Sequence, residues 1–196
     1  MTPEEDLTPE ERLSELQGQD LGVDFSTRRI FLVGDIDENM SKAFIQALHV
    51  LDKTPGSVSI TLNSGGGEEV AGYAIYDAIK LARSPAAIEV FGQASSIAAA
   101  VFQAGHSRGI APHADFMIHN GDREVGTTEN NSIQRTAKNI ERDSLRYWKV
   151  LLEGAQKKNP KMTMRRIKGM CDRETYLTAE EAVKCGFADW ILTARP

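Results

Sequence analysis

The sequence predicts a single α/β domain built on parallel strands, and three observations support this. A unit of one strand followed by one helix recurs three times, with about thirty residues from strand to strand, the length of a βαβ crossover. Each of these strands ends at or near a glycine, where the chain can turn into the helix. The chain has 196 residues, of which 41% are hydrophobic, enough for one domain with a sizeable core. Parallel strands joined in this way imply right-handed crossovers.

The three repeated units are identified by their apolar patterns. Strands are predicted at residues 30–33, 57–62 and 87–91. The first two helices are predicted from apolar side chains at helical spacing, which are Phe44, Leu48 and Leu51 in one and Val70, Ala74, Ala78 and Leu81 in the other. The third unit continues into a run of small residues at 97–104, which predicts a buried helix.

The second half of the chain contains a stretch that predicts a helix leaving the domain. Residues 128–158 are heavily charged, and their apolar positions make only a partial stripe. Such a helix projects from a domain or packs against a neighbour, and does not lie in a core. A last helix is predicted from the capping box of Thr178 and Glu181, with Gly186 in the C′ position. Further strands are predicted at residues 108–111, 116–119 and 188–192.

Charge and composition limit the classes of partner. The net charge is −5 and the basic residues are scattered among acids, so we expect no nucleic-acid partner. No apolar run approaches the length that spans a bilayer, and the acidic start lacks the apolar region of a signal peptide. The two cysteines fit a reducing, cytoplasmic compartment. We expect an acidic N-terminal segment at residues 1–25 and one domain at residues 26–196.

Two strand-to-helix corners are candidate sites. Residues 92–96 (GQASS) follow the third predicted strand, and Ser96 stands where the small-residue helix begins. Free backbone N–H groups there could hold an acyl oxyanion, although serine is also the ordinary N-cap residue. Residues 63–67 (NSGGG) form the second corner, which predicts an oxyanion hole, a docking edge for a peptide backbone or a plain tight turn. Two glutamates and no Lys-Ser/Thr follow it, which disfavours a phosphate cradle.

His119 is the candidate general base. It closes the predicted strand 116–119, and the ends of strands are where sites gather in α/β sheets. A serine nucleophile needs such a base, and the base needs an acid that fixes its tautomer. Candidate acids follow at Asp172 and Glu174, which could equally be solvated charges before a helix.

These features together resemble the proteolytic subunit of the Clp protease, a family of serine peptidases. The resemblance runs over residues 29–192 and depends on the order and spacing of several short motifs. They are IFLVG at 30–34, ENM at 38–40, NSGGG at 63–67, AIYD at 74–77, GQASS at 92–96, MIH at 117–119 and LTAEEA at 177–182.

The resemblance implies roles for individual residues. Ser96, and not Ser95, matches the nucleophile of the family, and His119 matches the general base. The backbone N–H groups of Gly67 and Ile97 match the oxyanion hole. No cofactor or metal is implied for this chain.

The triad acid departs from the family pattern. The family's aspartate aligns with Glu174, whose extra methylene shifts the carboxylate, and Asp172 is the alternative acid. Residues 174–178 (ETYLT) are more similar to Clp-like peptidases of phages and mobile elements than to housekeeping subunits.

The resemblance also implies a fold, an assembly and partners. The fold is a crotonase-like spiral of ββα units with a protruding long handle helix. Family members form two stacked heptameric rings, a tetradecamer, around a closed chamber, into which an AAA+ unfoldase that consumes ATP feeds unfolded protein. Residues 1–25 would then be an arm or a pore loop. The alternatives are an inactive structural subunit of a mixed ring, a phage capsid-maturation protease, and an acyl-CoA enzyme of the wider crotonase superfamily, which has no Ser–His pair.

Overall fold

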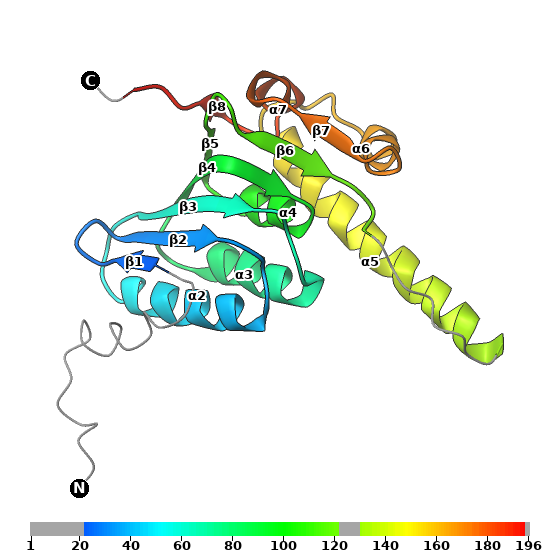
Figure 1. Ribbon diagram of the computed structural model, residues 1–196, viewed down its shortest axis with the longest axis horizontal. Helices are drawn as coiled ribbons and strands as arrows, with labels where there is room; N and C mark the ends of the chain where they lie inside the picture. Colours follow the sequence, from blue (N-terminus) through cyan, green and yellow to red (C-terminus); the bar gives the residue numbers. More distant parts are fainter. Residues whose placement is uncertain (1–21, 122–129, 195–196) are drawn as a thin grey trace, which may run out of the picture.

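The computed structural model describes residues 22–121 and 130–194, which are organised around an eight-stranded sheet (Figure 1). The strands are β1 (Gly22–Asp24), β2 (Arg29–Val33), β3 (Val58–Ser64), β4 (Ala86–Ser95), β5 (Ser107–Ile110), β6 (Asp115–Ile118), β7 (Thr175–Leu177) and β8 (Trp190–Ile191). The helices are α2 (Glu38–Leu51), α3 (Glu69–Leu81), α4 (Ile97–Gln103), α5 (Asn130–Gln156), α6 (Met164–Cys171) and α7 (Ala179–Cys185).

The strand pairing confirms the predicted parallel sheet over its centre. The order is β1-β2-β3-β4-β5-β8, and all pairs from β2 to β8 along this path are parallel. Strand β4 is longer than predicted, because it pairs with β5 along its first half and with β6 along its second half. The strands β1 and β7, which the sequence did not predict, pair antiparallel with β2 and β6. At three residues each, they are too short to show an alternating pattern.

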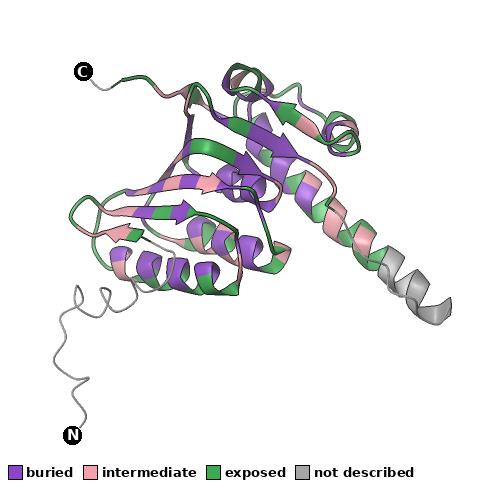
Figure 2. Cartoon of the chain, viewed as in Figure 1, coloured by how far each residue is buried: buried purple, intermediate pink, exposed green. Residues whose placement is uncertain are grey.

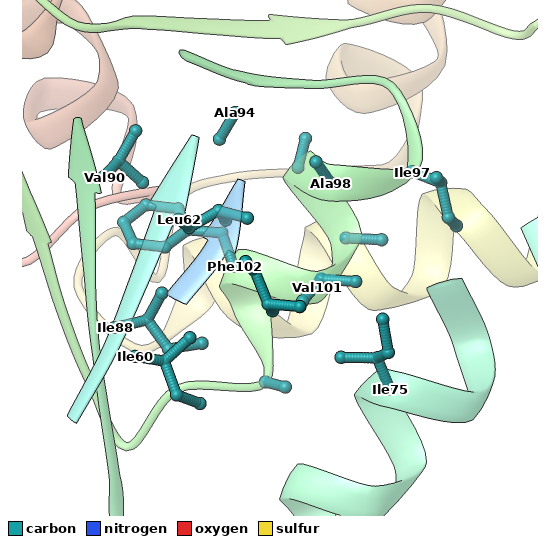
Figure 3. Close-up of a cluster of buried hydrophobic side chains, with 14 of the residues drawn as sticks. Ile60, Leu62, Ile75, Ile88, Val90, Ala94, Ile97, Ala98, Val101 and Phe102 are labelled. Atoms are coloured by element: carbon teal, nitrogen blue, oxygen red, sulfur yellow. The ribbon is translucent and has the colours of Figure 1, made fainter. Parts of the chain in front are cut away.

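The core lies between the sheet and the helices α2, α3 and α4, which cover one of its faces (Figures 1 and 2). Ile60 of β3 and Ile88 of β4 lie next to Phe102 of α4 in this core (Figure 3). All seven residues of α4 are buried, which confirms the buried small-residue helix predicted from the sequence. The corner that precedes α4 is therefore fixed by the core itself.

Helix α3 turns a different face to the core from the one that its sequence suggested. Val70 and Leu81, at the two ends of the predicted stripe, are 82% and 84% exposed. The buried face is instead made by residues such as Ala71 and Ile75. The reason is Gly72, where an added Cβ would collide with the side chain of Ile97. The close approach of α3 to α4 at this glycine decides which face is buried.

Helix α5 is the long charged helix that the sequence predicted, and it projects from the body of the domain (Figure 1). The prediction that it stays out of the core is wrong for its second half. Tyr147, Val150, Leu151 and Ala155 are all buried. One helix therefore has a projecting first half and a second half that packs beside α4.

The ends of the chain and its final helix can be compared with the predictions only in part. Residues 1–21 of the predicted N-terminal segment lie outside the described residues, and the chain then enters the sheet as β1. The capping box of Thr178 and Glu181 is present at α7, and Gly186 has the positive φ of 89° expected at its C-cap. Within residues 22–121 and 130–194, no helix combines the length and apolarity needed to cross a membrane. The same residues contain no group of three His, Cys, Asp or Glu side chains arranged to hold a metal ion.

A buried ion pair ties the base of α5 to the sheet. Arg108 of β5 is fully buried, and its Nη2 lies 2.7 Å from Oδ1 of Asp189. The guanidinium also donates to Oε1 of Gln103 in α4 and, at 2.8 Å, to the carbonyl of Gly154 in α5. One side chain thus joins the sheet to two helices. Its charge is tolerated inside the protein only while the carboxylate is present.

We expect Asp189→Asn to destabilise the fold by about 3–5 kcal/mol, because the substitution leaves the Arg108 charge buried without its counter-ion. Denaturant unfolding measures this change. Arg83→Ala is the matched control, because the Arg83 side chain is 86% exposed and its Nε lies 3.7 Å from Asp52. An exposed pair of this kind contributes less than about 1 kcal/mol. Equal losses in the two variants would contradict the prediction.

Candidate active site

Ser96 stands at a strained corner between β4 and α4. Its backbone angles are φ 56° and ψ −127°, in the positive-φ region that residues other than glycine rarely adopt. Its side chain makes no capping hydrogen bond to α4, so it is not the ordinary N-cap that the sequence left open. The neighbouring Ser95 is buried, and its hydroxyl lies 3.1 Å from Oε1 of Gln93. Of the two serines, Ser96 is therefore the one that lines the open pocket at this corner.

The pairing of β4 with β6 brings His119 to Ser96. Ser95 is in register with Met117, and the Ser96 N–H donates to the Met117 carbonyl at 3.0 Å. Just past the end of β6, Nε2 of His119 lies 2.8 Å from Oγ of Ser96. This is the distance at which an imidazole can take the proton of a hydroxyl.

The glycine loop after β3 lies directly against Ser96. Gly66 has a φ of 108°, and an added Cβ would lie 2.7 Å from Cβ of Ser96 and 2.9 Å from the carbonyl oxygen of Ser95. On its other side, the loop is held by Ile36, whose N–H donates to the Gly66 carbonyl at 2.7 Å. The Ile36 carbonyl accepts from the Glu68 N–H at 2.8 Å. Only glycine fits between these two contacts, so the predicted tight corner is also a close approach to the serine.

Two backbone amides next to this contact have no partner among the described residues. Ile97 follows Ser96 and is the first residue of α4, so its N–H has no acceptor within the helix. Gly67 has a φ of 138°, and an added Cβ would collide with the carbonyl oxygen of Ile36. In the part of the chain that the structure describes, neither N–H donates a backbone hydrogen bond. Both amides are therefore free to donate to an acyl oxygen.

The backbone brings Glu174 opposite His119, but its side chain points elsewhere. The antiparallel register joins Met117 to Tyr176 and Ile118 to Thr175, so the next position in the ladder would join His119 to Glu174. The φ of Glu174 is 49°, which ends the strand there. Its carboxylate accepts from the Tyr176 hydroxyl at 3.0 Å, and this contact raises the pKa of Tyr176.

The alternative acid, Asp172, has a different partner. Its Oδ1 accepts from Nδ2 of Asn120, the residue after His119, at 2.8 Å. Among the hydrogen bonds and ion pairs of the described residues, none joins Asp172 or Glu174 to His119. The structure thus brings Ser96 and His119 together. Each candidate acid is hydrogen-bonded to a different residue, Asp172 to Asn120 and Glu174 to Tyr176.

Three further residues support the pair, and the sequence did not predict them as site residues. The hydroxyl of Tyr147 donates to the carbonyl of Ser96 at 2.9 Å. Nε1 of Trp148 donates to Oδ1 of Asn120, also at 2.9 Å. In the sequence, Trp148 is one position of the partial apolar stripe of the long helix. Nothing in the sequence around Tyr147 indicates that its hydroxyl contacts Ser96. The sequence feature that could have indicated this support is the position of Asn120, which directly follows the candidate base His119.

We expect Gly66→Ala to destabilise the protein by about 1–3 kcal/mol, because alanine would have to adopt a strained backbone and displace Ser96. Gly65→Ala is the matched control in the same loop. An added Cβ at Gly65 meets only Nε2 of Gln93, at 3.7 Å, so that variant should unfold like the wild type. Denaturant unfolding of the two variants measures the difference. A Gly66→Ala protein as stable as Gly65→Ala would show that the contact with Ser96 is not tight.

Known proteins resemble this chain in sequence and in fold. The family model of the Clp protease matches residues 17–195. A curated relative, the ATP-dependent Clp protease proteolytic subunit 4 of Rhodococcus jostii (strain RHA1), is 29% identical over 171 residues, which are 85% of this chain and 85% of the relative. The solved structure of a point mutant of ClpP1 from Listeria monocytogenes matches the fold with a TM-score of 0.78 and 24% identity, over 87% of this chain and 94% of that chain. The match of the family model over nearly the whole sequence, on the fold described above, shows that this chain belongs to the Clp protease family.

Proposed function

We propose that this chain is a serine endopeptidase in which Ser96 is the nucleophile and His119 the general base. The observation that carries the proposal is the 2.8 Å separation of Ser96 Oγ and His119 Nε2 at a strained strand-to-helix corner. Membership of the Clp protease family supports peptide bonds as the substrate class. An acyl-CoA enzyme of the crotonase superfamily would not need this pair.

In the proposed reaction, Ser96 Oγ attacks the carbonyl carbon of a peptide bond while His119 Nε2 takes its proton. The negative charge moves to the carbonyl oxygen, which the free amides of Gly67 and Ile97 would hold. His119 then protonates the leaving amine, which leaves an acyl-enzyme on Ser96. Water then attacks the ester carbonyl while His119 takes its proton; the bond to Ser96 Oγ breaks, the acid product leaves, and His119 returns the proton to Ser96 Oγ. This acyl transfer needs no metal or cofactor on the chain.

We propose Glu174 as the acid that orients His119, with Asp172 as the alternative. The register of β6 and β7 supports Glu174, because its next position, just beyond the last pair Ile118–Thr175, would place residue 174 opposite His119. A change of side-chain rotamer would take the carboxylate from Tyr176 to the imidazole. Asp172 is held by Asn120 and would have to break that hydrogen bond to do the same.

The proposed working form is a homo-oligomer of stacked heptameric rings in the cytoplasm, fed with unfolded protein by an AAA+ ATPase. The curated relative is named as a subunit of an ATP-dependent protease, which supports such an assembly. Two free, buried cysteines suit a reducing compartment.

Ser96→Ala should lower the hydrolysis of a short fluorogenic peptide by a factor on the order of 10³ or more, because it removes the atom that attacks. Peptidase assays of both proteins test this, with native mass spectrometry of the same samples to show equal assembly. A fluorophosphonate probe should label Ser96 of the wild type only. A wild-type protein that assembles but is not labelled would be an inactive structural subunit, and this would refute the proposal.

Glu174→Gln should lower kcat by about 10²- to 10⁴-fold, because an uncharged partner no longer stabilises the imidazolium and its tautomer. Asp172→Asn is the comparison, since it removes one charge two residues away and keeps the side-chain shape. We expect the larger loss in Glu174→Gln, measured as kcat on the same peptide. The opposite ranking would assign the acid to Asp172.

A further inference from the structure

We propose that helix α5 holds the Ser96–His119 pair in its reactive geometry, through Tyr147 on the serine and Trp148 on the residue next to the histidine. Tyr147 and Trp148 are then positioning residues for the reaction. This inference rests on the proposed peptidase function, and it adds to it a support that the triad residues themselves do not provide.

Tyr147 supports the strained corner. It is 8% exposed, and its hydroxyl donates to the carbonyl of Ser96 at 2.9 Å. The same carbonyl accepts from the Ala99 N–H at 3.0 Å, and the Ser96 N–H is held by Met117. Both polar backbone groups of a residue with φ 56° are thus held from outside. A strained conformation persists only where its surroundings determine it in this way.

The hydroxyl of Tyr147 remains a donor over the working pH range. Burial raises the pKa of Tyr147 well above its ordinary value, because the phenolate would be desolvated. The protonated phenol therefore keeps its hydrogen bond to the Ser96 carbonyl throughout the neutral and mildly alkaline range.

Trp148 supports the histidine side of the pair. Its Nε1 donates to Oδ1 of Asn120 at 2.9 Å, while Nδ2 of Asn120 donates to Asp172 at 2.8 Å. The amide of Asn120 is therefore fixed at both ends, directly after His119 in the chain. Successive residues of a helix point in directions about 100° apart, so Tyr147 and Trp148 can reach two different strand ends.

The support predicts a loss of rate without a loss of substrate affinity. The side chains of Tyr147 and Trp148 donate to groups of the protein that are themselves in place before substrate arrives. A small displacement of a reacting group costs up to about 100-fold in rate. The Tyr147→Phe and Trp148→Phe variants remove one hydrogen bond each and keep an aromatic ring.

The test measures kcat, KM and the rate of fluorophosphonate labelling at Ser96 for the wild type and for Tyr147→Phe, Trp148→Phe and Tyr76→Phe. We expect kcat and labelling to fall about 10- to 100-fold in the first two variants, with KM unchanged. Tyr76→Phe is the matched control on α3, because the Tyr76 hydroxyl makes no hydrogen bond to a described residue and lies outside the pocket. Thermal unfolding shows that each variant is folded at the assay temperature.

Each outcome decides the inference. Labelling of Tyr147→Phe at the wild-type rate would overturn it while the peptidase function stands. If Tyr147→Phe does not fold, Trp148→Phe decides, and a wild-type kcat in that variant overturns the inference. A fall in kcat and labelling at constant KM in both variants, but not in Tyr76→Phe, supports it. If the wild type itself is not labelled at Ser96, the proposed function fails, and the inference fails with it.

Discussion

The parallel pairing of β4 with β6 is the constraint on which the site depends. Ser95 is in register with Met117, and the hydrogen bond from the Ser96 N–H to the Met117 carbonyl closes this ladder at the end of β4. The following residues of the two strands are then forced to be neighbours. That is why a hydroxyl and an imidazole that are 23 positions apart in the chain lie 2.8 Å from each other. A shift of one residue in this register would turn the histidine to the other face of the sheet.

The strained corner at Ser96 is stable because the residues around it pack closely against it and hold its backbone. A positive φ at a residue other than glycine costs about 1–3 kcal/mol, which the surrounding contacts must offset. Gly66 leaves room for the serine side chain, and the buried helix α4 fixes the chain that follows. The result is a hydroxyl that is excluded from capping its own helix and faces the pocket instead. Close packing thus maintains the strained backbone of Ser96, and the strained backbone directs the hydroxyl into the pocket.

Much of the fold could be predicted, because its signals are local. The repeated strand-helix units, the capping box at α7 and the burial of α4 all follow from spacing within a few residues. The buried face of α3 could not be predicted, because it is set by contact between Gly72 and Ile97, which are far apart in the sequence. The same holds for the second half of α5, where the burial of Tyr147 and Leu151 is set by tertiary packing, while the polar residues that dominate the first half make the helix as a whole look solvent-exposed. At the site, Ser96 and His119 stand at strand ends that periodicity can find, whereas the contacts of Tyr147 and Asn120 depend on how α5 packs.

The acid is the hardest residue to assign from sequence, and the reason is physical. The ladder between β6 and β7 determines where the backbone of Glu174 lies, but not where its flexible side chain points. Opposite residues in an antiparallel pair have Cα atoms about 4.5–5.5 Å apart, within reach of a glutamate. The competing hydrogen bond from Tyr176 is exposed to water, which competes for both the phenol and the carboxylate. In the proposed reaction the neutral imidazole of His119 takes a proton and becomes a cationic imidazolium, which attracts a carboxylate more strongly than a neutral phenol does. In our proposal, the same backbone position would hold Glu174 on Tyr176 in the free chain, as the structure has it, and on His119 during catalysis.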